Sequence, residues 1–83
     1  MKINVRYFAS LREALGSGET VDATEGSTVA QLRDALIARG APHDQALARG
    51  RAVRTALDQT LCDEARPLHD GAELAFFPPV TGG

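Results

Sequence analysis

The sequence predicts a small α+β domain in which helices cover one face of a mixed β-sheet. Three observations support this prediction. Polar and apolar residues alternate at the N-terminus, an apolar run lies near the C-terminus, and a stretch between them has helical periodicity. The two terminal strands are the most hydrophobic, so we expect them in the middle of the sheet, covered on one face by the longest helix.

Residues 2–8 are expected to form the first strand. Ile3, Val5 and Tyr7 share one face because side chains alternate along a strand, and the residues between them are polar. Phe8 breaks the alternation and falls on the polar side. This strand therefore carries an aromatic side chain that its buried face does not use.

Residues 10–16 are expected to form a short helix. Ser10 and Glu13 have the spacing of a capping box, in which side chains bond the backbone N–H groups of the first turn. Gly16 suits the C-terminal end of this helix. A weaker second strand is expected at residues 19–24, between two glycines.

Residues 27–40 form the longest predicted helix. Thr28 and Gln31 have the spacing of a second capping box, and Gly40 suits the end of the helix. The apolar stripe of this helix consists of Val29, Leu32 and Leu36. Another short helix is expected within residues 41–50.

Two short strands are expected next, at residues 53–57 and near Leu61, with Asp58–Gln59 as the turn between them. The last strand is expected at residues 72–77. Prolines follow it and end it, because proline cannot donate a ladder hydrogen bond. Phe77 is out of phase with the other large apolar residues of this strand.

This order of elements suits a β-grasp sheet, in which the first and last strands are central, adjacent and parallel. The helices are then expected on one face of the sheet. We expect one folded domain at residues 1–79, followed by a flexible tail at residues 80–83.

Composition excludes several classes of function. The 83 residues, 43% of them hydrophobic, provide one small core, and a net charge of −2 lacks the basic footprint of nucleic-acid binding. No stretch approaches the ~18 apolar residues of a membrane helix, and the N-terminus lacks a signal-peptide core. Cys62 is the only cysteine. We therefore expect a reducing, cytoplasmic location without a membrane or nucleic-acid partner.

The side chains do not predict a catalytic or metal site. His43 and His69 lack metal-ligand spacing, and both are expected at the surface. Cys62 lacks a nearby helix start or basic partner and is expected to be structural or incidental. The acidic residues Asp58, Asp63 and Glu64 are expected to form a solvated loop face.

The end of the sequence, FFPPVTGG, is the strongest functional signal. Gly82 and Gly83 have no β-carbon, so a narrow channel can admit them, and the prolines before them limit the freedom lost on threading. A terminal carboxylate becomes reactive once it is adenylated, because the phosphate then leaves. An extended segment of Val80, Thr81, Gly82 and Gly83 could carry the terminal carboxylate into a buried site of another protein. Alternatively, the glycines belong to a frayed end.

Three segments together resemble the small subunit of molybdopterin synthase, the MoaD family. They are AFFPPVTGG at the end, YFASLREALG near the start and STVAQLRDAL in the middle. The resemblance covers the whole chain, and the final nonapeptide is its most specific part. It implies a ubiquitin-like β-grasp fold, in agreement with the pattern of predicted elements.

The resemblance also implies a sulfur carrier with no catalytic side chains and no bound metal or cofactor of its own. A ubiquitin-activating-type enzyme of the MoeB kind would use ATP to adenylate Gly83, and sulfur would replace AMP to give a thiocarboxylate. The tail would then enter a large subunit of the MoaE kind and pass sulfur to cyclic pyranopterin monophosphate. Transfer of a second sulfur completes the dithiolene of molybdopterin. The family further implies a heterotetramer with the large subunit.

Phe8, Leu61 and Phe77 are expected to form a docking surface opposite the helices. Parallel terminal strands would place the two phenylalanines on that face, with Leu61 on the adjoining strand region. The resemblance places these three at positions that contact the large subunit, and Pro78 is expected to belong to the same surface. The activating enzyme would use this surface in turn. Alternatively, the three residues close a second, minor core.

Three other functions remain open. The chain also fits another carrier of the same fold, such as the thiamine-pathway protein ThiS, although such carriers generally lack FFPP before the glycines. A ubiquitin-like modifier that forms isopeptide bonds is the second alternative. A plain interaction domain with an idle tail is the third.

Overall fold

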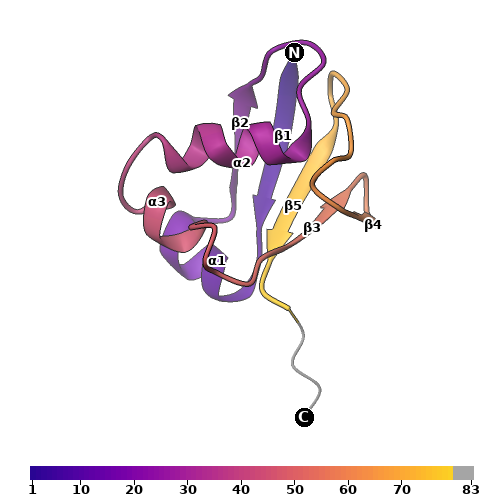
Figure 1. The fold of residues 1–83 in the computed structure, drawn as a ribbon. Helices are drawn as coiled ribbons and strands as arrows, with labels where there is room; N and C mark the ends of the chain where they lie inside the picture. The colour runs from indigo at the N-terminus through magenta and orange to yellow at the C-terminus, as the bar shows by residue number, and fades with distance from the viewer. Residues whose placement is uncertain (80–83) are drawn as a thin grey trace.

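The computed structural model describes residues 1–79, which form one five-stranded sheet and three helices (Figure 1). The elements in chain order are β1 (Lys2–Tyr7), α1 (Ala9–Leu15), β2 (Gly18–Asp22), α2 (Val29–Ile37), α3 (His43–Ala46), β3 (Arg54–Leu57), β4 (Thr60–Cys62) and β5 (Glu73–Phe77). This is the predicted order. None of the helices in the described residues is long and apolar enough to cross a membrane.

The strands lie in the order β2-β1-β5-β3-β4, so the first and last strands of the chain are adjacent inside the sheet. β1 runs parallel to β5, with Tyr7 beside Phe76, whereas the other neighbours are antiparallel. Figure 1 shows the helices in front of the sheet, on one face. The predicted α+β fold with a β-grasp sheet is confirmed.

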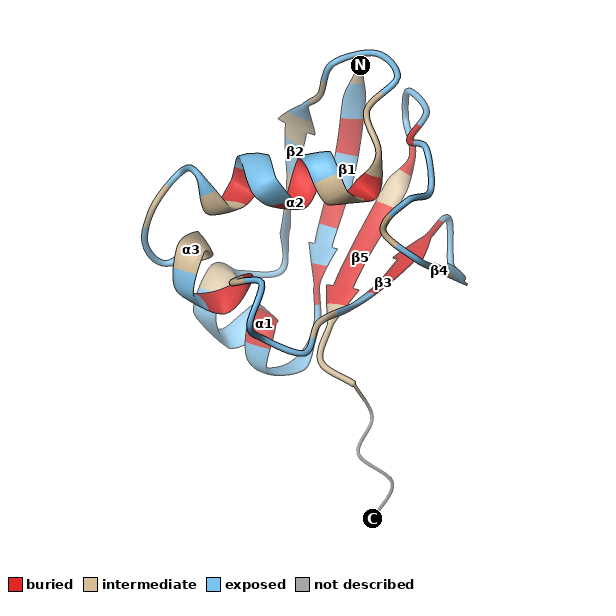
Figure 2. Cartoon of the chain, viewed as in Figure 1, coloured by how far each residue is buried: buried red, intermediate tan, exposed pale blue. Residues whose placement is uncertain are grey.

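The core lies between the sheet and the helices, where Figure 2 shows the buried residues. Ile3, Val5 and Tyr7 are buried along β1 and alternate with exposed residues, as the sequence predicts. The predicted stripe of α2 is also buried. Its members Val29, Leu32 and Leu36 join Leu74 and Phe76 of β5 in one hydrophobic cluster.

The start of α1 differs from the prediction, because Ser10 does not cap it. The N-cap is Phe8, whose backbone is extended and whose N–H donates to the carbonyl of Phe76, 3.2 Å away. This hydrogen bond extends the sheet ladder to Phe8, and the helix begins directly afterwards at Ala9. Ser10 therefore lies inside the first turn and not at its cap. Ala9 adopts φ = 53°, a left-handed conformation that is uncommon for alanine. The predicted end of this helix at Gly16 is confirmed by a φ of 91°.

The capping box of α2 is confirmed. The Thr28 hydroxyl accepts from the Gln31 N–H at 3.3 Å, and the Gln31 Oε1 accepts from the Thr28 N–H at 2.9 Å. α2 ends at Ile37, before Gly40, and α3 is shorter than the segment predicted for it. The turn between β3 and β4 is also confirmed, since Asp58 and Gln59 both have positive φ, as a tight hairpin requires.

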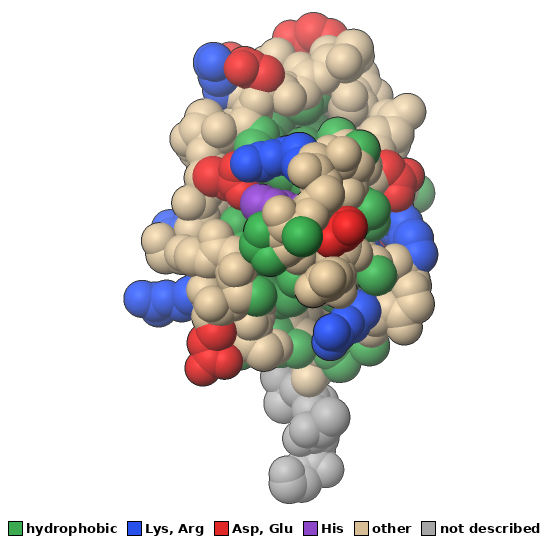
Figure 3. Space-filling view, turned by 90° about the vertical axis from the view of Figure 1, so that its left-hand side faces the viewer, with side chains coloured by type: hydrophobic (Ala, Val, Ile, Leu, Met, Phe, Trp, Pro, Cys, Tyr) green, Lys and Arg blue, Asp and Glu red, His purple; other side chains and the backbone are tan. Residues whose placement is uncertain are grey.

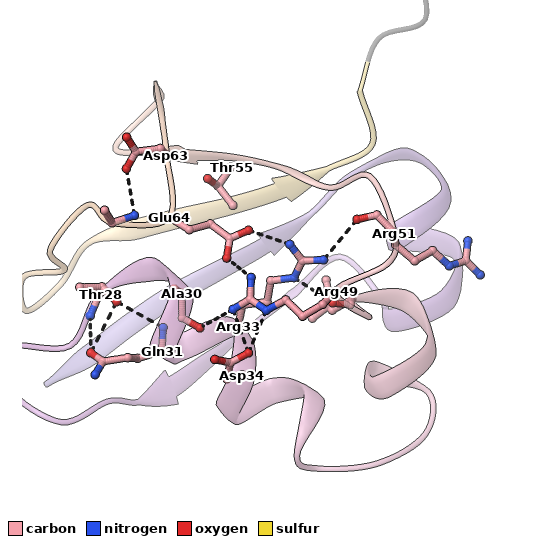
Figure 4. Close-up of polar contacts among 12 residues, drawn as sticks. Thr28, Ala30, Gln31, Arg33, Asp34, Arg49, Arg51, Thr55, Asp63 and Glu64 are labelled. Carbon is pink, nitrogen blue, oxygen red and sulfur yellow. Dashed lines mark hydrogen bonds and ion pairs between the residues drawn. The ribbon is translucent and has the colours of Figure 1, made fainter.

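A buried arginine joins α2 to the connection that follows α3 (Figure 4). Arg33 is 3% exposed, and its guanidinium donates to the carbonyls of Leu47 and Ala48, both at 2.8 Å. It also pairs with Glu64 at 2.7 Å. A planar guanidinium can satisfy several acceptors at once, so this one side chain holds a segment that has little regular structure of its own.

The prediction of an acidic loop face at residues 58–64 is wrong for Glu64. Arg49 bonds Glu64 from a second side, and also Asp34 and the Ala30 carbonyl, so Glu64 lies between two arginines. Burial opposes ionisation of Glu64, but the hydrogen bonds from Arg49 and Arg33 outweigh it and lower its pKa. The Asp63 carboxylate accepts from the backbone N–H of Ala65 at 2.9 Å, and Asp58 accepts from the Glu73 N–H. The three acidic residues therefore form no common cluster.

The prediction that both histidines lie at the surface is wrong for His43, whose side chain is 12% exposed. Its Nε2 lies 2.9 Å from Glu19, which also accepts from the Tyr7 hydroxyl at 2.8 Å and pairs with Arg39. Figure 3 shows a histidine between cationic and anionic side chains on this side of the molecule. Burial opposes ionisation of Glu19, but bonds from Arg39, His43 and Tyr7 lower its pKa to about 2.

Candidate functional site

The sheet face turned away from the helices, here called the open face, carries the predicted docking residues. Side chains alternate along each strand, so the neighbours of buried residues point to this face. On β5, Ala75 and Phe77 alternate with Leu74 and Phe76, which face the core; Ala75 is also buried, and Phe77 is half-buried. The register pairs Ala75 with Arg6 of β1. Residues from all the inner strands therefore meet on the open face.

Phe8 and Phe77 are neighbours, as the sequence predicts. Tyr7 pairs with Phe76, and the bond from the Phe8 N–H to the Phe76 carbonyl continues this ladder by one step. Phe8 is 42% exposed and Phe77 is half-buried. Arg6 lies over the Phe8 ring, 6.0 Å from its centre, within the range of a cation–π contact. An aromatic pair therefore stands at the end of the sheet where β5 finishes.

Leu61 lies on the same face, two strands away from β5. It pairs with Ala56 of β3, which pairs in turn with Ala75 of β5. At about 4.8 Å per strand, Leu61 lies about 10 Å from the middle of β5. Leu61 is 62% exposed, and the alanines between it and Phe77 have small side chains. Two buried alanines, Ala56 and Ala75, thus separate Leu61 from Phe77 on this face.

We call Phe8, Leu61 and Phe77 the anchor patch. Phe8 and Leu61 are the large hydrophobic residues that are exposed in the described part of the chain. A second core closed by these residues, the alternative raised above, is not what residues 1–79 form. Exposed apolar groups gathered on one face are typical of a binding surface.

Sequence analysis assigned no site role to two arginines on the open face. Arg54 pairs in register with Phe77, and Arg6 of β1 pairs with Ala75, two residues earlier on β5. Arg6 is also 3.9 Å from Glu73, a long ion pair between partly exposed groups, which contributes little to stability. The alternation of polar and apolar residues along β1 was enough to place Arg6 on the open face. Placing Arg54 there required the strand register.

The predicted tail residues Val80, Thr81, Gly82 and Gly83 lie outside the described residues. Pro78 and Pro79 are described and half-buried, and they end β5 as predicted. Pro78 directly follows Phe77. The sequence that the resemblance singled out therefore begins beside the anchor patch.

The remaining candidates have structural roles in the described residues. Asp58 accepts from the Glu73 N–H and from His69, and these bonds lower its pKa and raise that of His69. His69 is exposed, as predicted. Cys62 is half-buried on the helix-covered side, with Thr55 Oγ1 at 3.6 Å from its sulfur. Within residues 1–79, no group of three His, Cys, Asp or Glu side chains is placed to hold a metal.

Comparison with known sequences adds a family to this geometry. A model of the ThiS family matches residues 5–83. The Escherichia coli protein named "Molybdopterin synthase sulfur carrier subunit" is 43% identical over 81 residues, which cover 98% of this chain and 99% of the relative. The Haemophilus influenzae protein of that name is 36% identical with the same coverage. "Small archaeal modifier protein 3" of Haloferax volcanii is 33% identical over 97 residues, with both chains fully covered.

Solved structures have the same fold. Molybdopterin converting factor subunit 1 of Pyrococcus furiosus superposes with a TM-score of 0.81 at 26% identity, covering 96% of this chain and 99% of that one. A chain from the complex of subunits 1 and 2 of the molybdopterin-converting factor of Helicobacter pylori superposes with a TM-score of 0.71 at 26% identity. The superposition covers all of this chain and all of the Helicobacter pylori chain.

Proposed function

Because this chain belongs to the ThiS family, we propose that it is a sulfur-carrier subunit of molybdopterin synthase. The observation that carries the proposal is that the family match includes the terminal glycines, which follow Phe77 of the anchor patch after a short segment, PPVT. The curated relatives named as sulfur carrier subunits match along nearly their whole length. The described residues contribute a binding surface to this role.

The proposed chemistry takes place at Gly83. Its carboxylate attacks ATP within an activating enzyme of the MoeB type, forming an acyl adenylate and releasing pyrophosphate. A donor of sulfur at the oxidation level of sulfide then attacks the adenylate carbonyl. A C–S bond forms, the C–O bond to phosphate breaks, AMP leaves, and a thiocarboxylate remains. In the large subunit, this sulfur passes to cyclic pyranopterin monophosphate to build the dithiolene. ATP is thus a substrate of the partner, and the pathway's use of ATP favours the cytoplasm as the location.

The anchor patch has the proposed role of docking both partners. The Helicobacter pylori relative occurs in a complex of subunits 1 and 2, which supports a large-subunit partner for this chain. Phe8 and Phe77 lie where a partner could bury them together, and aromatic side chains are frequent binding hot spots. Val80, Thr81 and Gly82 would then enter the partner's channel. Since both partners need the same surface, they should compete for this protein, and simultaneous binding would contradict the shared surface.

Intact mass after incubation with ATP, an activating enzyme and a sulfur source tests the proposal. Exchange of one oxygen for sulfur at the terminus is the expected result. The archaeal modifier relative makes protein conjugation the second candidate, and amide conjugates on lysines of other proteins would support that role instead. An unchanged mass with an enzyme that activates the Escherichia coli relative would support the plain interaction domain.

A further inference from the structure

The chain has almost no lysine. Nine side chains are lysine or arginine, and Lys2 is the single lysine. The arginines are Arg6, Arg12, Arg33, Arg39, Arg49, Arg51, Arg54 and Arg66. Lysine and arginine carry the same charge, but an amine that has lost its proton is a nucleophile, whereas the guanidinium stays protonated at any ordinary pH. The choice between them therefore has chemical consequences near an activated carbonyl.

The fold explains some of these arginines and not others. Arg33 and Arg49 each bond several acceptors, including backbone carbonyls, which an ammonium group could not satisfy in the same plane (Figure 4). Arg54 is exposed, and its guanidinium makes no hydrogen bond or ion pair within residues 1–79. Arg6 has the long contact with Glu73 and lies over the Phe8 ring, 6.0 Å from its centre, and a lysine ammonium can make both of these contacts. Nothing in the described structure requires a guanidinium at positions 6 and 54.

The amines of Lys2 and Met1 lie at the far end of the sheet. The carbonyl of Lys2 accepts from the Gly71 N–H, which places Lys2 level with the residues before β5. Its ammonium is paired with Asp22 at 2.7 Å, and the Met1 amine donates to the Ala23 carbonyl at 2.8 Å. Phe77 lies six residues further along than Gly71, a distance of about 20 Å at ~3.3 Å per residue. Residues 78–83 span at most about the same length, so only a fully stretched and reversed tail would reach Lys2.

We propose that the sheet end next to the tail is kept free of primary amines, so that the activated Gly83 does not acylate its own chain, and that Lys2 is the only lysine able to link copies. The proposal rests on the proposed function, which supplies the acyl adenylate. In the excluded reaction, an amine attacks the adenylate carbonyl. A C–N bond forms, the C–O bond to phosphate breaks, AMP leaves, and the nitrogen releases a proton to solvent. An amide would end the carrier's use, because sulfur could no longer displace AMP.

A lysine would react most readily with the activated Gly83 if it stood at position 54. Arg54 is the register partner of Phe77, and such cross-strand partners have Cβ atoms about 5 Å apart. Because position 54 lies beside Phe77, an amine there would be tethered close to Gly83 through residues 78–83. Such a tether gives an effective concentration on the order of millimolar. Cys62, the other strong nucleophile, faces the helix-covered side, where it packs against the core beside Thr55.

The test uses the chain with a C-terminal thioester in place of the carboxylate, so that no activating enzyme is needed. Arg54→Lys keeps the charge and supplies an amine beside Phe77, and Arg6→Lys independently supplies one on β1, beside Ala75. Arg66→Lys, in the loop before β5, is the matched control. Intact mass and peptide mapping at about 10 µM protein then follow the loss of thioester over time.

We expect Arg54→Lys to lose its thioester at least about tenfold faster than the parent, forming a cyclic amide one water lighter than the free acid. Arg66→Lys should behave as the parent, and Lys2→Arg should abolish any Lys2-linked dimer formed at high concentration. Parent-like decay in both Arg54→Lys and Arg6→Lys, or a cyclic amide at Lys2 in the parent, would overturn the proposal. Because the thioester is made chemically, either result is independent of whether the sulfur-carrier function holds.

Discussion

The two faces of the sheet differ in how far they bury residues that are neighbours in the sequence. On the helix-covered face, Tyr7 and Phe76 are fully buried, and the Tyr7 hydroxyl has a carboxylate partner. On the open face, the adjacent Phe8 is exposed and Phe77 is half-buried. The polar networks around Arg33 and Glu19 also lie on the helix side. We infer that one face stabilises the domain while the other is available for partners, so that substitutions should separate stability from function.

The largest expected effect concerns the tail and leaves both faces intact. Removing Gly83, or adding a residue after it, should abolish sulfur transfer, because the activated carboxylate is then absent or misplaced. The thermal midpoint should stay nearly unchanged. Transfer assays with the partner enzymes and thermal melts measure the two quantities. Transfer that persists in a chain extended beyond Gly83 would refute the role of this residue.

A side chain within the tail should be nearly as harmful. Gly82→Val places a β-branched group where a channel is expected to admit only backbone, so transfer should fall severely while docking is retained. Binding to the large subunit and sulfur transfer should be measured separately. A parallel substitution at Val80, Val80→Ala, serves as the mild control. Equal loss in both variants would argue against a narrow channel around Gly82.

Neighbouring phenylalanines provide the sharpest test of the two faces. Phe76→Ala should destabilise the domain by about 3–5 kcal/mol, because it empties a fully buried site. Phe77→Ala should affect folding much less but weaken partner binding about 30–150-fold, since burying one ring contributes roughly 2–3 kcal/mol. Denaturant unfolding and calorimetric titration with the large subunit measure the two effects. If Phe77→Ala unfolds the domain without a separate binding defect, the division between faces is wrong.

The arginine network should affect stability alone. Arg33→Met should lower the free energy of unfolding by about 2–3 kcal/mol, because it leaves the buried Leu47 carbonyl without a donor and removes the bond to Ala48, whose carbonyl keeps only the Arg51 N–H. The loss should be below the ~3–5 kcal/mol of a wholly buried pair, since Arg49 still neutralises Glu64. The exposed Arg66→Ala is the control. A binding defect at temperatures where Arg33→Met remains folded would connect this network to the open face.

The smallest effect is pH-dependent and belongs to the helix side. The pKa of Glu19 falls from its usual 4.5 to about 2 in the folded protein, so the ionised group stabilises the fold above pH ~4.5. This contribution is lost as the pH falls through 2. Glu19→Gln should therefore lower the thermal midpoint at neutral pH, and its difference from the parent should shrink between about pH 4.5 and 2. A pH-independent difference would mean that packing, not charge, is responsible.

Much of the fold followed from local patterns. Alternation identified the buried face of β1, the spacing of Thr28 and Gln31 identified the cap of α2, and Asp58–Gln59 marked a hairpin turn. These features involve residues close in sequence, so their geometry depends on short-range sterics and hydrogen bonds. The out-of-phase positions of Phe8 and Phe77 were also visible in the sequence, because a period of two assigns each residue to a face.

The sequence by itself determined which residues face the core, and the role of the terminal glycines remains a prediction from the sequence. The tertiary structure decided the partners of the polar groups. His43 and Glu19 are 24 residues apart, and Arg33 and Glu64 are 31 apart, so no local pattern indicated that they pair. The start of α1 was likewise set by a sheet bond to Phe76 rather than by Ser10. Faces depend on periodicity along one segment, whereas pairing depends on how distant segments pack, and only the folded chain fixes that.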